Sequence, residues 1–81
     1  MMGDLRPLSF LSAGTEATIA EVRAGKGMRS RLSGMGFCPE TRVTVQCADR
    51  GSLIVSVGDA RYALSRGVAM KVLVKNTPEE S

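Results

Sequence analysis

Residues 25–39, GKGMRSRLSGMGFCP, are the most informative stretch of this 81-residue chain. Met28, Leu32 and Met35 stand at positions i, i+4 and i+7, which places them on one face of an α-helix. Gly36 follows the last of them, at the point where a helix commonly ends in a left-handed residue. The stretch therefore predicts a short helix between glycines.

Alternating apolar and polar residues on both sides of this stretch predict short β-strands. Ala17 and Ile19 share one face of a strand at residues 15–23, but Val22 breaks the alternation, which indicates a bulge near Glu21. Four further strands are predicted at residues 41–48, 53–57, 61–64 and 69–75. Five short strands with a helix after the first favour a mainly β fold, a small closed barrel, because closure removes exposed strand edges.

Strand parity predicts which side chains face the core. Cys47 shares its parity with Val43 and Val45, so it is expected to point inward as a small hydrophobe. In the last strand Met70 is expected to share one face with Val72 and Val74, opposite Lys71, Leu73 and Lys75. That strand could also leave a pairing edge, which keeps self-association open.

The length of the chain predicts one small domain spanning residues 1–81. Its core is expected at about residues 8–75, between a short flexible lead-in and a polar tail. Turn residues at 49–52 and 58–59 separate the strands, and residues 65–67 are typical of a single helical turn.

The charge pattern favours an acidic partner only weakly. Eleven basic and eight acidic residues give a net charge of +3, and the arginines are interleaved with Asp and Glu along the whole chain. Nucleic-acid binders usually concentrate their positive charge and offer aromatic platforms. The chain has two Phe, one Tyr and no Trp, so a basic barrel that binds nucleic acid is kept only as an alternative.

No reactive constellation is evident. The chain contains no His, and Cys38 and Cys47 match no zinc spacing, so both are expected to be reduced thiols. Residues 25–27, Gly-Lys-Gly, lack the Gly-Lys-Ser/Thr of a phosphate loop and are interpreted as hinge residues. With no nucleophile beside a base and no carboxylate pair, we predict no catalytic, cofactor or metal residues, and no enzyme activity.

No apolar run approaches the roughly 18 residues that a membrane-spanning helix needs. The first residues, MMGDLRPLSF, lack the basic and apolar regions of a secretory signal. A cytoplasmic location is therefore expected.

The predicted helix allows two interpretations for each of its prominent residues. Leu32 and Met35 are core residues at helical spacing, but part of their row could remain accessible as a docking patch for a partner. Arg29 lies on the polar face, where it is either solvated or paired with an acidic partner. Arg31 lies at the edge of that face, and its guanidinium could also bind loop carbonyls near the end of the helix.

With these residues in view, the chain resembles the FeoA family, small cytoplasmic accessory proteins of bacterial ferrous-iron uptake. The most specific match is the string R-L-x-x-M-G-F-x-P at residues 31–39, and the resemblance covers roughly residues 8–75. The other matching positions are Leu8, Ser9, Leu11, Gly14, Ala17, Ile19, Gly27, Val43, Val45, Gly51, Val55, Val57, Ala63, Leu64, Ser65 and Ala69.

The resemblance implies an SH3-like β-barrel with an added helix. It also implies binding to the cytoplasmic GTP-binding region of the FeoB membrane transporter, modulation of uptake, and peripheral association with the inner membrane only through that transporter. Whether the effect is activation or inhibition stays open. A related SH3-like domain occurs in metal-dependent transcriptional repressors and is the alternative identity. The expected partner-binding residues are Met28, Arg29, Arg31, Leu32, Met35 and Phe37.

One position departs from the family pattern. The family usually has Gly after Pro39, and this chain has Glu40. Pro-Gly suits a type II turn, which needs a positive φ at its second central residue. Since Glu disfavours a positive φ, a type I turn or a longer bend is expected here.

Overall fold

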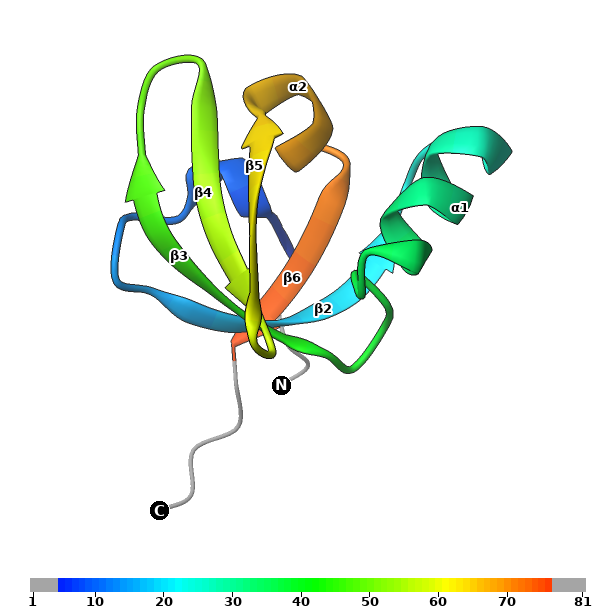
Figure 1. The fold of residues 1–81 in the computed structure, drawn as a ribbon, viewed down its shortest axis with the longest axis horizontal. Helices are drawn as coiled ribbons and strands as arrows, with labels where there is room; N and C mark the ends of the chain where they lie inside the picture. The colour runs from blue at the N-terminus through cyan, green and yellow to red at the C-terminus, as the bar shows by residue number, and fades with distance from the viewer. Residues whose placement is uncertain (1–4, 77–81) are drawn as a thin grey trace.

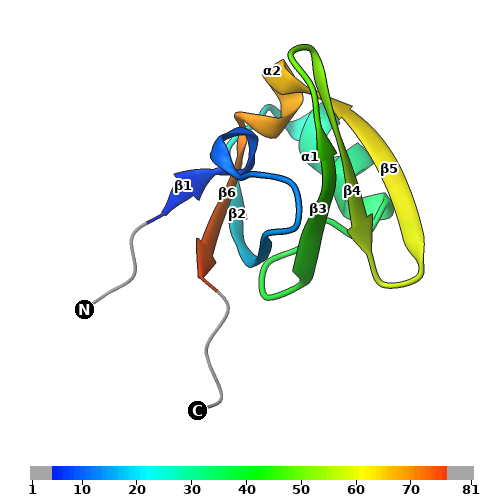
Figure 2. The same cartoon turned by 90° about the vertical axis from the view of Figure 1, so that its left-hand side faces the viewer.

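The computed structural model describes residues 5–76 of the chain. Six antiparallel strands form one sheet in the order β1-β6-β2-β3-β4-β5, with α1 beside the sheet (Figure 1). The 3₁₀ turn η1 and the helix α2 lie together at one end of the sheet (Figure 2). The elements are β1 (Arg6–Pro7), η1 (Leu8–Phe10), β2 (Glu16–Val22), α1 (Lys26–Gly34), β3 (Arg42–Ala48), β4 (Ser52–Val57), β5 (Ala60–Ser65), α2 (Arg66–Ala69) and β6 (Val72–Asn76).

The mainly β class is confirmed, but the closed barrel of five strands is wrong in two respects. A further strand, β1, pairs with β6 through Arg6↔Val74 and Pro7↔Leu73. The strands β1 and β5 lie at opposite ends of the sheet order, so the sheet is open. The last strand is not an edge either, because β6 lies between β1 and β2.

Fifteen apolar side chains form the core, and every strand from β2 to β6 contributes to it. Phe37 is the largest of the fully buried side chains. It lies in the segment after α1 and belongs to no strand. The alternation predicted for β3 and β4 is confirmed over Val43, Val45, Leu53 and Val55. The core residues are Leu8, Leu11, Ala17, Ile19, Leu32, Phe37, Val43, Val45, Leu53, Val55, Val57, Leu64, Ala69, Val72 and Val74.

Two β-bulges alter the strand parity, and only one of them was predicted. The register between β2 and β6 shifts between Ile19 and Glu21, as Val22 indicated. A second shift, between β3 and β4, lies between Val45 and Cys47. An extra residue at a bulge moves every later side chain to the other face. The prediction that Cys47 points inward is therefore wrong, and its thiol is free and exposed.

The prediction that Met70 shares a face with Val72 and Val74 is also wrong, since Met70 is 56% exposed and the two valines are buried. The helix α2 extends to Ala69, Met70 caps its C-terminus, and β6 starts only at Val72. Ser65 caps the other end of α2, its hydroxyl accepting a hydrogen bond from the Val68 amide at 3.2 Å. The helical turn predicted at residues 65–67 is therefore longer than expected, and it includes the start of the strand predicted at residues 69–75.

The predicted stop of α1 at Gly36 is confirmed, and it forms a Schellman motif. Gly36 has a φ of 103°. The amide of Phe37 donates to the carbonyl of Leu32 at 2.9 Å, and the amide of Gly36 donates to the carbonyl of Ser33 at 3.0 Å. Phe37 and Leu32 also supply the buried apolar pair that often accompanies this motif. The motif thus turns the chain so that Phe37 enters the core.

The turn after α1 differs from the expectation for Glu40. The amide of Thr41 donates to the carbonyl of Cys38 at 3.1 Å, which closes a four-residue turn over Pro39 and Glu40. Glu40 has a φ of 72°, so this is the type II geometry with its left-handed second central residue. Its amide donates to the carbonyl of Ile19 at 2.8 Å, which holds the turn against β2. The expected type I turn or longer bend is therefore wrong.

Replacing Glu40 by glycine is expected to raise the free energy of unfolding by about 0.5–1 kcal/mol, because Gly adopts a left-handed φ without a steric penalty. The change also removes the ion pair between Glu40 Oε2 and Lys75 Nζ at 3.0 Å, which is exposed and contributes little. Urea denaturation of Glu40→Gly and Glu40→Gln separates the two effects, because Gln loses the ion pair but keeps the strained φ. A Gly variant no more stable than the Gln variant would contradict strain at this position.

Arg66, rather than Arg31, binds loop carbonyls. Its Nε donates to the carbonyls of Asp49 and Arg50, both at 2.9 Å, and its Nη1 donates to the carbonyl of Ser9 at 2.8 Å. These bonds join α2, the loop between β3 and β4, and η1. Among residues 5–76, Arg31 has no such bond. The structural role considered for Arg31 therefore belongs to Arg66.

Replacing Arg66 by methionine is expected to lower the free energy of unfolding by about 2–3 kcal/mol, since three carbonyls lose a charged donor while the apolar stem is kept. Arg50→Met is the matched control, because the side chain of Arg50 is exposed and only its carbonyl takes part. Equal thermal midpoints for the two variants would show that the three bonds add little.

Candidate docking surface

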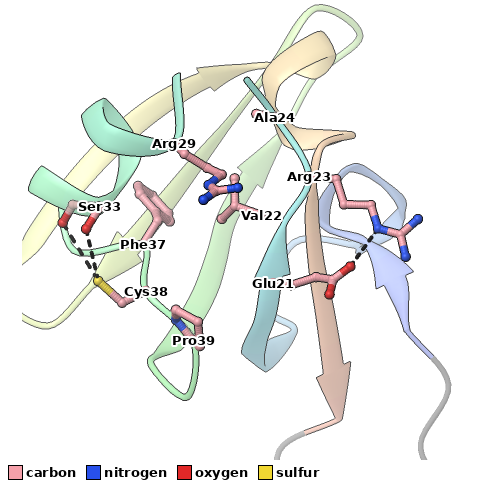
Figure 3. A pocket seen from close by; sticks show the side chains of 9 residues that line it. All are labelled: Glu21, Val22, Arg23, Ala24, Arg29, Ser33, Phe37, Cys38 and Pro39. Carbon is pink, nitrogen blue, oxygen red and sulfur yellow. Dashed lines mark hydrogen bonds and ion pairs between the residues drawn. The ribbon is translucent and has the colours of Figure 1, made fainter. Parts of the chain in front are cut away.

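Two grooves flank α1, one on each side of the helix. The larger, about 540 Å³, lies between α1, the end of β2 and the chain after the helix (Figure 3). The smaller, about 190 Å³, lies between α1, β5 and α2. The larger groove is lined by Glu21, Val22, Arg23, Ala24, Arg29, Ser33, Phe37, Cys38 and Pro39. The smaller is lined by Met28, Arg31, Leu32, Met35, Ala63, Leu64, Ser65 and Val68.

The six residues expected to bind a partner do not all lie in the same groove. Met28, Arg31, Leu32 and Met35 meet in the smaller groove, whereas Arg29 and Phe37 line the larger one. Leu32 is 3% exposed and is confirmed as a core residue, so it can serve only as part of the groove floor.

Phe37 lines the larger groove, but only 1% of its surface is exposed. Its ring packs against that of Tyr62, with 5.7 Å between the ring centroids. The Schellman motif at Gly36 turns Phe37 into the core, so a partner in the larger groove would meet only a small part of its ring.

The larger groove is polar and partly self-paired. Arg23 Nε donates to Glu21 Oε2 at 2.6 Å, and both side chains are exposed. Arg29 reaches toward Val22 across the groove (Figure 3), and in the described part of the chain it has no ion pair. Ser33 Oγ lies 3.6 Å from Cys38 Sγ, which links α1 to the chain after it. The main feature that this groove offers a ligand is therefore the guanidinium of Arg29, which has no ion pair within residues 5–76.

The smaller groove combines an apolar interior with one cation. Leu32 and Leu64 are buried at its floor, and Met28 and Met35 pack partly against the core. Methionine side chains adapt readily to different apolar partners. Arg31 is exposed at the rim, and its guanidinium has no ion pair within residues 5–76. The arrangement suits an apolar side chain that carries a carboxylate close by.

The second wall of the smaller groove was not predicted. Ala63, Ser65 and Val68 come from β5 and α2, about thirty residues after α1 in the chain. The only signal in the sequence was the helical turn predicted at residues 65–67, which indicates an element but not its position. Sequence periodicity on α1 identifies one wall of a groove and cannot identify the other.

The described residues hold no group of three or more His, Cys, Asp or Glu side chains that could bind a metal ion. Cys38 and Cys47 are free thiols, and Glu40 is paired with Lys75. No helix within residues 5–76 has the length and apolar character to cross a membrane.

The fold is that of a small, mainly β domain with a helix at its side. Solved structures share this fold: FeoA, an iron uptake regulatory protein, has a TM-score of 0.83 at 29% identity over 89% of this chain and 97% of its own. The zinc complex of FeoA from Stenotrophomonas maltophilia, described as an SH3 domain protein, has a TM-score of 0.74 at 29% identity over 91% of this chain and 89% of its own. The module is thus SH3-like.

The FeoA domain model matches residues 6–76, and the chain belongs to the FeoA family. The family is involved in ferrous-iron transport. A Methanocaldococcus jannaschii protein named "Putative Fe(2+) transport protein A" is 33% identical over 70 residues, which cover 86% of this chain and 85% of that protein.

A manganese-dependent transcriptional repressor has a TM-score of 0.86 at 20% identity. The match covers 95% of this chain and 44% of the repressor. This likeness shows the shared fold alone.

Proposed function

We propose that this protein is a non-enzymatic accessory protein of ferrous-iron uptake that binds the cytoplasmic GTP-binding domain of a FeoB-type transporter and modulates transport. The observation that carries the proposal is the smaller groove, where Met28, Arg31 and Met35 surround a buried apolar floor. Membership in the FeoA family supplies the link to ferrous iron. Because the partner's domain is cytoplasmic, we place the protein in the cytoplasm, at the membrane only when it is bound.

The groove offers both an apolar and an electrostatic contribution to binding. Burying one Leu-sized side chain contributes about 1.5–3 kcal/mol. An unpaired guanidinium at the rim adds a charge-assisted hydrogen bond to a carboxylate and disfavours a basic partner. A small apolar centre beside a charged rim is the usual anatomy of a specific protein interface.

A nucleic-acid partner is less well supported by the charges. Three of the basic side chains form ion pairs with acidic neighbours: Arg23 with Glu21, Arg42 with Glu16, and Lys75 with Glu40. This pairing offsets part of the positive charge that a phosphate backbone would need to meet. The exposed aromatic side chain is Phe10, a single platform where strand binders use several.

Titration calorimetry with the soluble GTP-binding domain of the cognate transporter tests the proposal. Saturable binding is expected, and parallel runs with GDP and a non-hydrolysable GTP analogue show whether the nucleotide state matters. A separate anaerobic run with ferrous iron alone is expected to give only the heat of dilution. Absence of binding in every nucleotide state would overturn the proposal.

A further inference from the structure

The strand β5 ends the sheet and leaves one side unpaired. Its inner side pairs with β4 along its whole length, from Ser52↔Ser65 to Val57↔Ala60. No other strand of the described chain lies beyond it in the sheet order. Such an edge can accept a strand from another molecule.

The hairpin geometry identifies the backbone groups that face outward. Gly58 and Asp59 form a two-residue turn, and Gly58 has a φ of 61°. The residues that flank a two-residue turn, Val57 and Ala60, form a hydrogen-bonded pair, and such pairs then alternate along the ladder. The amides and carbonyls of Arg61 and Ala63 therefore point away from β4. Within residues 5–76 neither residue has a backbone hydrogen bond outside the β4–β5 pair.

This open edge borders the smaller groove. Ala63 lines the groove together with Met28, Arg31 and Met35 of α1. An extended segment that follows β5 would therefore meet backbone partners on one side and an apolar helix surface on the other. Side chains of a strand alternate in direction, so every second side chain of that segment could enter the groove.

The charges around the edge of β5 indicate which charge a pairing segment should carry. Arg31 lies at the groove rim, and Arg61 shares the face of Ala63, two residues away; both arginines are exposed. No carboxylate is among the residues that line the groove. A second copy of this chain would bring the same cations to the interface, and like charges across an interface are unfavourable. An acidic segment would instead be attracted.

We propose that the partner contributes an extended acidic segment that pairs with the outer edge of β5 through Arg61 and Ala63. One apolar side chain of the segment sits between Met28, Met35 and Ala63, and a neighbouring carboxylate pairs with Arg31. This assignment rests on the proposed function, because it names the mode of binding at the same surface.

Amide hydrogen exchange, measured by NMR with and without the soluble GTP-binding domain, tests the assignment. In the free protein the amides of Tyr62 and Leu64 should exchange slowly and those of Arg61 and Ala63 fast, because only the first two are bonded to β4. On saturation with the domain, exchange at Arg61 and Ala63 should slow by about tenfold or more. The inward amides are the internal control, because their protection exists before binding.

The outcomes separate this assignment from the proposed function. Binding that leaves the Arg61 and Ala63 amides unprotected would overturn the strand pairing while the proposed function stands. No binding at all would overturn both. Protection in the free protein that rises with its concentration would assign the edge to a second copy and overturn the acidic segment.

Discussion

Replacing Phe37 by alanine is expected to lower the free energy of unfolding by about 3–5 kcal/mol, the usual cost of removing a buried aromatic ring. The ring is 1% exposed and packs on Tyr62. Phe37 also makes the apolar contact with Leu32 that accompanies the Schellman motif at the end of α1. The cavity left by alanine would therefore weaken the packing of the helix against the sheet. A domain of this size has only about 5–10 kcal/mol of stability, so the variant should approach the unfolding threshold.

Phe10→Ala is the matched control, because it removes the same ring from a position that is 72% exposed. Urea denaturation followed by circular dichroism should place its midpoint close to that of the original protein, and the midpoint of Phe37→Ala far lower. Similar midpoints for the two variants would be inconsistent with Phe37 as a central core residue.

Reversing the charge of Arg31 is expected to weaken binding of the transporter's GTP-binding domain by about 10- to 100-fold, since an attraction in the groove becomes a repulsion. The fold should tolerate Arg31→Glu, because in the described part of the chain this guanidinium has no partner to lose. The loss should appear mainly as faster dissociation if the charge pair lies inside the interface, and as salt-dependent association if it lies at the rim.

Arg29→Glu and Arg50→Glu make the same change in net charge at other places. Arg29 lines the larger groove, and the loop that carries Arg50, between β3 and β4, stands on the other side of the sheet from α1 (Figure 1). Surface plasmon resonance should show a small effect for Arg29→Glu and almost none for Arg50→Glu. If all three variants bind alike, the effect is one of net charge and the smaller groove is not the contact.

The sequence predicted what depends on local periodicity. Met28, Leu32 and Met35 with Gly36 define α1 and its left-handed end, because the apolar spacing and the glycine act within one helix. The alternation in β3 and β4 likewise predicts Val45 and Leu53 in the core. Tertiary structure does not change either signal.

The errors occur where a tertiary contact overrides the local signal. Cys47 faces solvent because the bulge in β3 changes the parity, and nothing in the residues themselves marks that bulge. Glu40 has a positive φ because its amide is bonded to Ile19, a partner twenty-one residues away in the chain. Met70 is exposed because α2 takes the start of the predicted last strand.

The candidate site could be predicted only in part for a similar reason. The spacing of Met28, Leu32 and Met35 predicted one face of α1. Which residues of the helix share a groove depends on where β5 and α2 lie. Arg29 and Arg31 are two residues apart and therefore lie on different sides of the helix. Their spacing in the sequence separates their directions, but it does not show that a groove lies on each side of α1.

The most direct test of the docking surface is an NMR titration of the ¹⁵N-labelled protein with the soluble GTP-binding domain. Shift changes are expected to cluster on Met28, Arg31 and Met35 and to continue onto Ala63 and Val68 across the smaller groove. Changes confined to Phe10 and Met70 at the η1–α2 end, with α1 unaffected, would contradict docking at this groove.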